Sequence, residues 1–193
     1  MEGDGRHLRR QHNRAAVVEA LLYLYGQGNL DPSAEEIAER AGLSARSLFR
    51  YFDDLGDLCR AAIVAQRQAL HALVPLRFDP GATLEYRVVR VVDHRVALFE
   101  AMGTVGQVWR LRAPFQPLLA QELTLWRSVL RDVLYDALRV GADPIGHAAL
   151  AAADALLSFE CYQLMRGDQL LSREQTTNAL VAAITAIFQQ PHS

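Results

Sequence analysis

Polar side chains with a clear chemical use lie between Ser33 and Phe52. Arg46 and Arg50 are four residues apart, so they share one face of any helix that contains them. A guanidinium donates parallel hydrogen bonds to a planar acceptor, either a phosphate or the O6 and N7 edge of guanine. These two arginines could therefore recognise an anion or the edge of a base.

The elements that hold these arginines are predicted to be two short helices. The first begins at Ser33, whose hydroxyl can accept from the amide of Glu36 while the Glu36 carboxylate reaches back to Ser33. Its buried stripe is Ile37, Ala38 and Ala41, at helical spacing. Gly42 follows and can take the positive φ that ends a helix.

The second helix is capped by Ser44 and buries Leu48 and Phe52. It turns four side chains outward: Ala45, Arg46, Phe49 and Arg50. A capped helix, a glycine turn and a second capped helix with an outward arginine indicate a helix-turn-helix motif over residues 33–52. The second helix of such a motif fits the DNA major groove.

The spacing Leu24…Gly28…Ser33-x-x-x-Ile37-Ala38-x-x-Ala41-Gly42-Leu43-Ser44-x-x-x-Leu48-Phe49-x-Tyr51-Phe52 resembles the DNA-binding domain of TetR-family transcriptional regulators. The resemblance covers residues 10–70. It implies that Ala45, Arg46 and Phe49 face bases, and that Ser47 and Tyr51 hold phosphates of double-stranded operator DNA. The full set of expected DNA-binding residues is Arg9, Arg10, Ser33, Ser44, Ala45, Arg46, Ser47, Phe49, Arg50 and Tyr51.

Two positions depart from the family pattern. Phe49 stands where the family usually has tyrosine, and Leu55 stands where it usually has lysine. Leu55 is flanked by acids at Asp53, Asp54 and Asp57, which repel phosphate. The family's phosphate clamp at this position is therefore not expected to operate in its usual form.

Positive charge is local rather than general. The 193-residue chain has a net charge of −2 and no lysine, but residues 6–14 hold four arginines, two histidines and no acid. We expect residues 1–9 to form a flexible arginine-rich arm that meets phosphates or the minor groove. The arm could supply the contact that Leu55 does not.

The whole pattern predicts an all-α fold: a three-helix helix-turn-helix head at 10–70 and a larger helical body at 71–193. A first helix is expected over 10–27, a further head helix over 54–74, and body helices over 83–102, 118–140, 144–166 and 172–189, with a linker at 75–81 and a turn at 141–144. The helix over 83–102 carries one apolar stripe, formed by Leu84, Val88, Val91, Val92, Val96 and Phe99.

The helices over 144–166 and 172–189 are apolar nearly all round. A helix without a polar face must be covered on every side. A second copy of the same pair would cover them, giving a homodimer through a four-helix interface. A core formed within one chain is the alternative, and the family resemblance implies the dimer.

The resemblance also implies a body that binds a small, largely apolar effector of unknown identity. The candidate lining residues are Phe99, Met102, Trp109, Phe115, Trp126, Glu160 and Tyr162. Each aromatic among them could instead be ordinary core. Glu160 shares a face with leucines, so burial would require a partner such as Arg110, Arg112 or another arginine.

Other functional classes find little support. The sequence has no nucleophile elbow, phosphate loop, dinucleotide fingerprint or zinc-protease motif, so no catalytic residues, metal or cofactor are expected and an enzyme is disfavoured. Cys59 and Cys161 do not form a disulfide or zinc framework, and no segment reads as a signal peptide or membrane span, which favours the cytoplasm. A helical protein-interaction module without DNA binding stays open as the alternative to a repressor.

Overall fold

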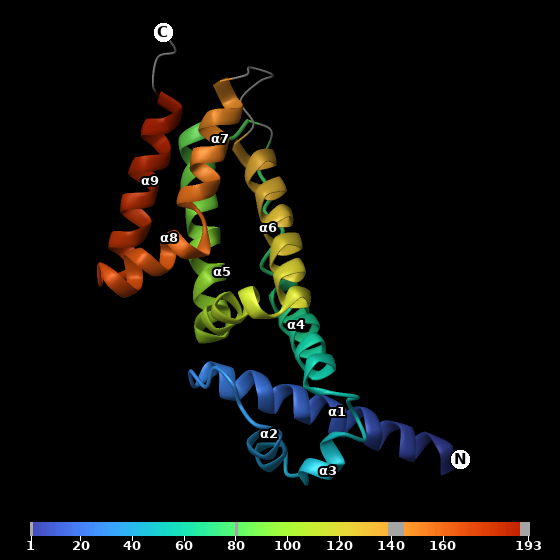
Figure 1. Ribbon diagram of the computed structural model, residues 1–193. Coiled ribbons are helices and arrows are strands. Elements are labelled where there is room, and N and C mark those ends of the chain that lie inside the picture. Colours follow the sequence, from blue (N-terminus) through green and yellow to red (C-terminus); the bar gives the residue numbers. More distant parts are fainter. Residues whose placement is uncertain (1, 80, 139–144, 190–193) are drawn as a thin grey trace. The chain divides into compact units, whose positions relative to one another are not determined.

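The computed structural model describes residues 2–79, 81–138 and 145–189, and all regular structure within these ranges is helical (Figure 1). This confirms the all-α fold class. The chain divides into two compact units. One comprises Met1–His71 and Met102–Thr124, and the other comprises Ala72–Ala101 and Leu125–Ser193. The first unit thus contains the expected head together with a segment, 102–124, that the sequence assigned to the body.

The head begins with α1 (Glu2–Gly26), which is followed by α2 (Ala34–Arg40), α3 (Ala45–Leu48) and α4 (Leu55–His71). The expectation that residues 1–9 form a separate arm is wrong from Glu2 onward, because these residues are the first turns of α1. The segment 6–16 contains no proline and is rich in good helix formers, so nothing stops the helix at Arg10. At its other end, α4 stops three residues before the predicted Val74.

The core of the first unit joins the helices of the head to the 102–124 segment. α1 contributes Val17, Leu21 and Tyr25, all buried. The remaining helices and turns contribute Ile37, Ala38, Leu48, Phe52, Leu58, Ala62, Ile63, Val108, Trp109, Leu119 and Leu123. Of the buried residues predicted for the helix-turn-helix, Ile37, Ala38, Leu48 and Phe52 are confirmed, whereas Ala41 is only half-buried. Their burial fixes which side of α2 and α3 faces solvent.

Helix α5 (Leu84–Arg112) continues past the predicted end at Met102, but it is kinked at Gly103. The φ of Gly103 is 50° and its ψ is −144°, a conformation that side chains other than glycine's rarely adopt. The predicted interruption is therefore at the right place, and the chain resumes its helix after it. The short η1 (Ala113–Phe115) and α6 (Pro117–Leu138) follow, and Pro114 and Pro117 lie at this break between α5 and α6.

The second unit ends with α7 (Ile145–Leu156), α8 (Phe159–Gln163), η2 (Leu164–Asp168) and α9 (Arg173–Gln189). The prediction of a single helix over 144–166 is wrong. The Ser158 hydroxyl accepts from the amide of Cys161 at 3.2 Å and starts a new helix in place of continuing the old one. At the start of α9, the Ser172 amide donates to Oε1 of Gln175 and the Gln175 amide donates to the Ser172 hydroxyl, which together form a capping box. The expected turn at 141–144 and the helix ends at Val140 and Pro144 lie outside the described residues.

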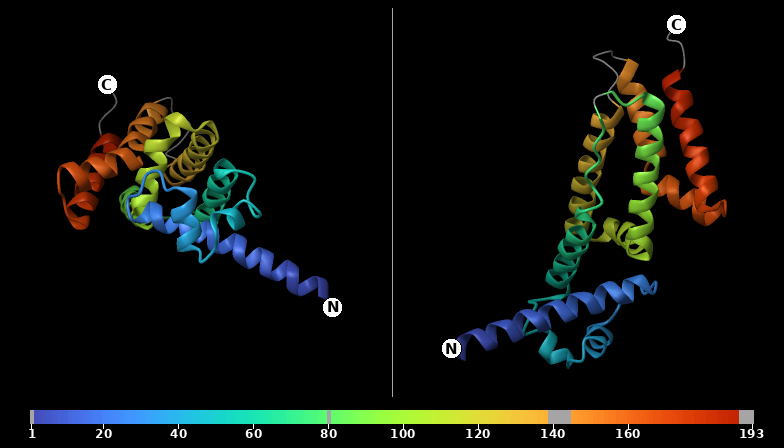
Figure 2. Two further views of the ribbon diagram at one scale, coloured as in Figure 1. Left: turned by 60° about the horizontal axis from the view of Figure 1, so that its bottom comes forward. Right: turned by 180° about the vertical axis from the view of Figure 1, so that it is seen from behind.

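α7 packs on both α8 and α9 (Figures 1 and 2). None of the helices described is long and apolar enough to cross a bilayer.

Candidate nucleic-acid interface

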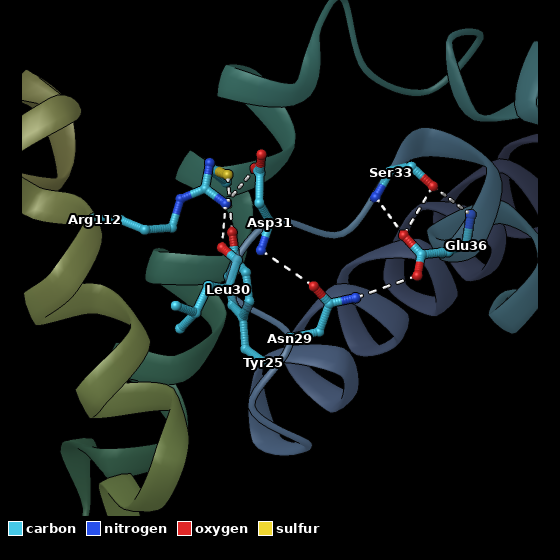
Figure 3. Close-up of polar contacts among 8 residues, drawn as sticks. Tyr25, Asn29, Leu30, Asp31, Ser33, Glu36 and Arg112 are labelled. Carbon is cyan, nitrogen blue, oxygen red and sulfur yellow. Dashed lines mark hydrogen bonds and ion pairs between the residues drawn. The ribbon is translucent and has the colours of Figure 1, made fainter.

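The first half of the helix-turn-helix is fixed by a complete capping box. The Ser33 amide donates to Oε2 of Glu36 at 2.7 Å, and the Glu36 amide donates to the Ser33 hydroxyl at 3.2 Å (Figure 3). The Ser33 hydroxyl also donates to Oε2 of Glu36 at 2.9 Å. The bond from the Ser33 amide to the carboxylate, and after it the bond from the Ser33 hydroxyl, lower the pKa of Glu36. Ser33 is therefore occupied with starting α2, although it is exposed.

The turn takes the predicted form. Gly42 has a φ of 69°, and the Leu43 amide donates back to the Ala38 carbonyl at 2.9 Å. Ser44 then caps α3, since its hydroxyl accepts from the Ser47 amide at 3.2 Å. Both serines that the sequence singled out as caps have that role in the structure.

The predicted base-reading set lies on α3 and on the turn that follows it. The second helix ends at Leu48, earlier than predicted, so Phe49 is its C-cap and Arg50 lies in the turn. Leu48 is buried, while Arg46 and Arg50 are exposed and Phe49 is 49% exposed. Ala45 is half-buried at the start of the helix. A solvent-facing arginine and phenylalanine on one short capped helix are able to contact a guanine edge and a thymine methyl.

Tyr51 is held by a residue that the sequence analysis missed. The Asn13 side-chain amide of α1 donates to the Tyr51 hydroxyl at 2.7 Å, which leaves the hydroxyl proton free to bond a phosphate. The neighbouring Arg14 guanidinium lies 4.7 Å from the centre of the Phe52 ring. No sequence signal links Asn13 to Tyr51, because the pair is 38 positions apart.

The expected phosphate contacts of the arm are changed by its helical state. Arg9 and Arg10 are exposed side chains of α1. Because these residues are helical, they do not form the extended segment that could lie in a minor groove.

Leu55 is 39% exposed at the first position of α4. The adjacent Asp54 side chain accepts from the Asp57 amide at 2.7 Å and so caps α4. Asp57 itself faces Arg60 at 3.8 Å. Leu55 is therefore not part of the buried core of the head, and its side chain is available at the surface.

Arg112 binds the loop that precedes α2 (Figure 3). Its Nη1 donates to the Leu30 carbonyl at 2.6 Å and to Oδ1 of Asp31 at 2.9 Å. Its guanidinium carbon lies 5.9 Å from the centre of the Tyr25 ring, and the Tyr25 hydroxyl lies 3.4 Å from the sulfur of Cys59. Burial and the contact with Cys59 raise the pKa of Tyr25. Arg112 thus ties α5 to the entrance of the helix-turn-helix within the first unit.

The candidate effector residues divide between the units. Met102, Trp109 and Phe115 belong to the first unit, where Trp109 is core and Phe115 is exposed. In the second unit, the ring centre of Phe99 lies 5.6 Å from that of Tyr162, and Trp126 is half-buried.

Glu160 is exposed, contrary to the burial that was considered for it. It pairs with Arg127 at 2.9 Å. The partner is therefore an arginine other than Arg110 and Arg112, which was one of the predicted possibilities. The alternative partner Arg112 is the residue that binds Leu30 and Asp31 in the first unit.

The sequence and the fold were compared with those of known proteins. Neither a protein-family model nor a curated protein sequence matches the chain. Solved structures do match. A transcriptional regulator from Rhodococcus sp. is 19% identical, with a TM-score of 0.71 over 93% of this chain and 96% of its own. A TetR-family transcriptional regulator from Streptomyces coelicolor is 17% identical, with a TM-score of 0.72 over 90% of this chain and 81% of its own.

A TetR transcriptional regulator from a Rhodococcus species is 16% identical, with a TM-score of 0.54 over 95% of this chain and 99% of its own. Since the likeness extends over nearly the full length of the chain, it includes both the head and the helical body. The chain has the fold of TetR-family transcriptional regulators.

Proposed function

We propose that the protein is a homodimeric, DNA-binding transcriptional regulator of the cytoplasm that acts as a repressor. A palindromic operator is bound by two copies of the head, and a small effector bound by the helical body releases it. The observation that carries the proposal is the capped helix-turn-helix whose buried side is Leu48 and Phe52 and whose free side is Arg46, Phe49 and Arg50. A helix pair of this form with a free arginine face suits the major groove.

The second copy is supported by the surfaces of α7 and α9. These two helices pack on each other and still expose small apolar side chains in the single chain. The exposed alanines are Ala148, Ala151, Ala152 and Ala155 on α7, and Ala179, Ala182 and Ala186 on α9. Small side chains allow close helix approach, so a two-fold axis through this face would bury them in a four-helix interface.

The dimer determines what the operator should look like. Two recognition helices related by a two-fold axis read the same half-site in opposite directions, with centres about one helical turn apart. The expected site is therefore a palindrome. Arg46 favours a guanine at one symmetric position in each half.

Selection of bound duplexes from random DNA by the full-length protein tests the proposal. The expected result is a palindromic consensus that is bound more tightly than scrambled DNA of the same length. Failure to enrich any sequence would overturn the proposal.

The other candidate function is a helical module that binds protein and not DNA. It is favoured by the acids Asp53, Asp54 and Asp57, which follow α3 and repel phosphate. An absence of salt-sensitive DNA binding, despite a folded head, would support that function. An enzyme has no comparable observation in its favour.

A further inference from the structure

Arg95 is a cation in the core of the second unit. It lies on α5 and is only 1% exposed. Its Nη2 donates to the Leu130 carbonyl of α6. Its Nε and Nη1 are also buried, and within the described residues they have no hydrogen-bond partner. Buried donors on a charged group are costly unless an acceptor meets them, so this position calls for an acceptor.

The surrounding charges do not supply that acceptor. Asp154 of α7 attracts Arg95, but its carboxylate bonds Nε of Arg131 at 3.0 Å. Burial, which outweighs this attraction, lowers the pKa of Arg95 to about 10. Arg95 therefore keeps its positive charge at neutral pH.

The register of α5 against α6 shows what lies next to this cation. Arg87 reaches the Ala137 carbonyl at 3.5 Å, and Arg95 reaches that of Leu130, so the two helices run antiparallel in the second unit (Figure 1). One turn further, about 5.4 Å along each axis, the same faces carry Phe99 on α5 and Trp126 on α6.

The helical turn that carries Phe99 and Trp126 is aromatic and contains a second unpartnered donor. The ring centre of Phe99 is 5.4 Å from that of Phe159 and 5.6 Å from that of Tyr162. Nε1 of Trp126 is buried and, among the residues described, has no hydrogen-bond partner. This turn therefore combines apolar ring surfaces with a free indole N–H, one turn from the buried guanidinium.

We propose that Arg95 anchors the carboxylate of a small aromatic acid, which accepts a charge-assisted hydrogen bond from Nε or Nη1, the two donors that have no partner among the described residues. The ring of the acid packs against Phe99 and its aromatic neighbours, and Nε1 of Trp126 donates to any hydrogen-bond acceptor that the ligand carries near it. A hydrogen bond between two ionised groups is roughly twice as strong as one between neutral groups, so a buried guanidinium favours a carboxylate over an amide of the same shape. The regulatory meaning of this site rests on the proposed function, whereas the binding itself does not.

Arg95 was absent from the candidates drawn from sequence, although a signal for it exists. It occurs at helical spacing from Val91, Val92 and Phe99, which places it within the apolar stripe of its helix. The effector expected from the sequence was largely apolar. The structure adds an anionic end to it.

Isothermal titration calorimetry of the full-length protein tests the proposal with phenylacetate and 3-phenylpropanoate. Phenylacetamide and 3-phenylpropanamide serve as neutral probes of the same shape. We expect at least one acid to bind, with its amide about 10- to 100-fold weaker, because hydrogen bonds to charged groups are worth that much. Arg95→Met should reduce acid affinity to that of the amide. The matched control is Arg90→Met, an exposed arginine on the same helix, which should leave affinity unchanged.

Three results would overturn the proposal: neither acid binds the wild-type protein, acid and amide bind equally, or Arg95→Met binds acid as the wild type does. Circular dichroism checks that each variant is folded. If Arg95→Met does not fold, Arg95→Lys replaces it, because lysine keeps the charge but lacks the Nε and Nη1 donors and should still weaken acid binding. Acid binding without a selected operator would overturn only the regulator function, and an operator without acid binding would overturn only this site.

Discussion

At the scale of single residues, Arg46 is the side chain on which sequence discrimination is expected to depend. It is exposed on α3, and Leu48 in the same helix is buried. A guanidinium paired with a guanine contributes about 1–3 kcal/mol of discrimination. Arg46→Ala should therefore relax the preference at one symmetric base pair in each half-site and leave folding intact.

The measurement is selection of bound sequences with the variant beside the wild type. Arg90→Ala, an exposed change on α5, is the control and should keep the full consensus. An unchanged consensus for Arg46→Ala would mean that this side chain contacts a phosphate and not a base.

Leu55 is the second residue on which DNA binding by the head is expected to depend. Because it is partly exposed at the start of α4, a lysine there can reach a phosphate without displacing core. Leu55→Lys should strengthen binding to operator and scrambled DNA by a similar factor. The slope of log affinity against log salt should steepen by about one unit, as expected for one added phosphate contact.

Titrations at several salt concentrations, with a thermal melt of each protein, measure both effects. Leu55→Gln is the uncharged control and should leave the salt slope unchanged. A lower melting temperature with no gain in affinity would show that Leu55 contributes to the core of the head.

At the scale of the elements, Arg112 of α5 is expected to hold the loop before α2 in place. The ion pair with Asp31 contributes little, since the Asp31 side chain is 89% exposed and exposed pairs are worth about 0–1 kcal/mol. The hydrogen bond to the Leu30 carbonyl is the stronger reason, because the Arg112 side chain is only 21% exposed. Arg112→Met should therefore speed amide hydrogen exchange across residues 30–37.

The matched variant Asp31→Asn removes the charge pair and keeps the bond to Leu30. It should change the exchange of residues 30–37 very little. Equal effects of the two variants would mean that the ion pair, and not the carbonyl contact, orders the loop.

At the scale of the whole molecule, a variant that tests the proposed dimer must change an exposed residue and not a buried one. Ile184 of α9 is fully buried within one chain, so an acid there would disrupt the fold before it tested association. Ala182 on the same helix is exposed. Ala182→Glu should place an unpaired charge in the proposed interface and shift the protein to monomer, without lowering its helix content.

Analytical ultracentrifugation at micromolar concentration measures the change. Ala101→Glu, on an exposed position of α5, is the control and should leave the dimer intact. A wild-type protein that sediments as a monomer at this concentration would exclude the dimer and, with it, the palindromic operator.

The sequence by itself determined the helix-turn-helix because every signal for it is local. The Ser33–Glu36 box, the positive φ of Gly42 and the Ser44 cap each involve residues within a few positions of one another. Such hydrogen bonds depend on neighbours in the sequence, so the starts and the outward sides of α2 and α3 could be predicted directly. Helix ends without a strong cap or breaker were less predictable, as the start of α1 shows.

Only the tertiary structure decided which distant residues meet. Tyr51 and Asn13, Arg112 and Leu30, and Arg95 and Leu130 are brought together by packing between helices, and spacing along the chain carries no information about such pairs. Burial depends on packing as well. The spacing places Arg95 within the apolar stripe of its helix, but only the packed helices remove its guanidinium from water. Its desolvation, and with it the demand for an anionic partner, comes from the neighbours that the fold places around it.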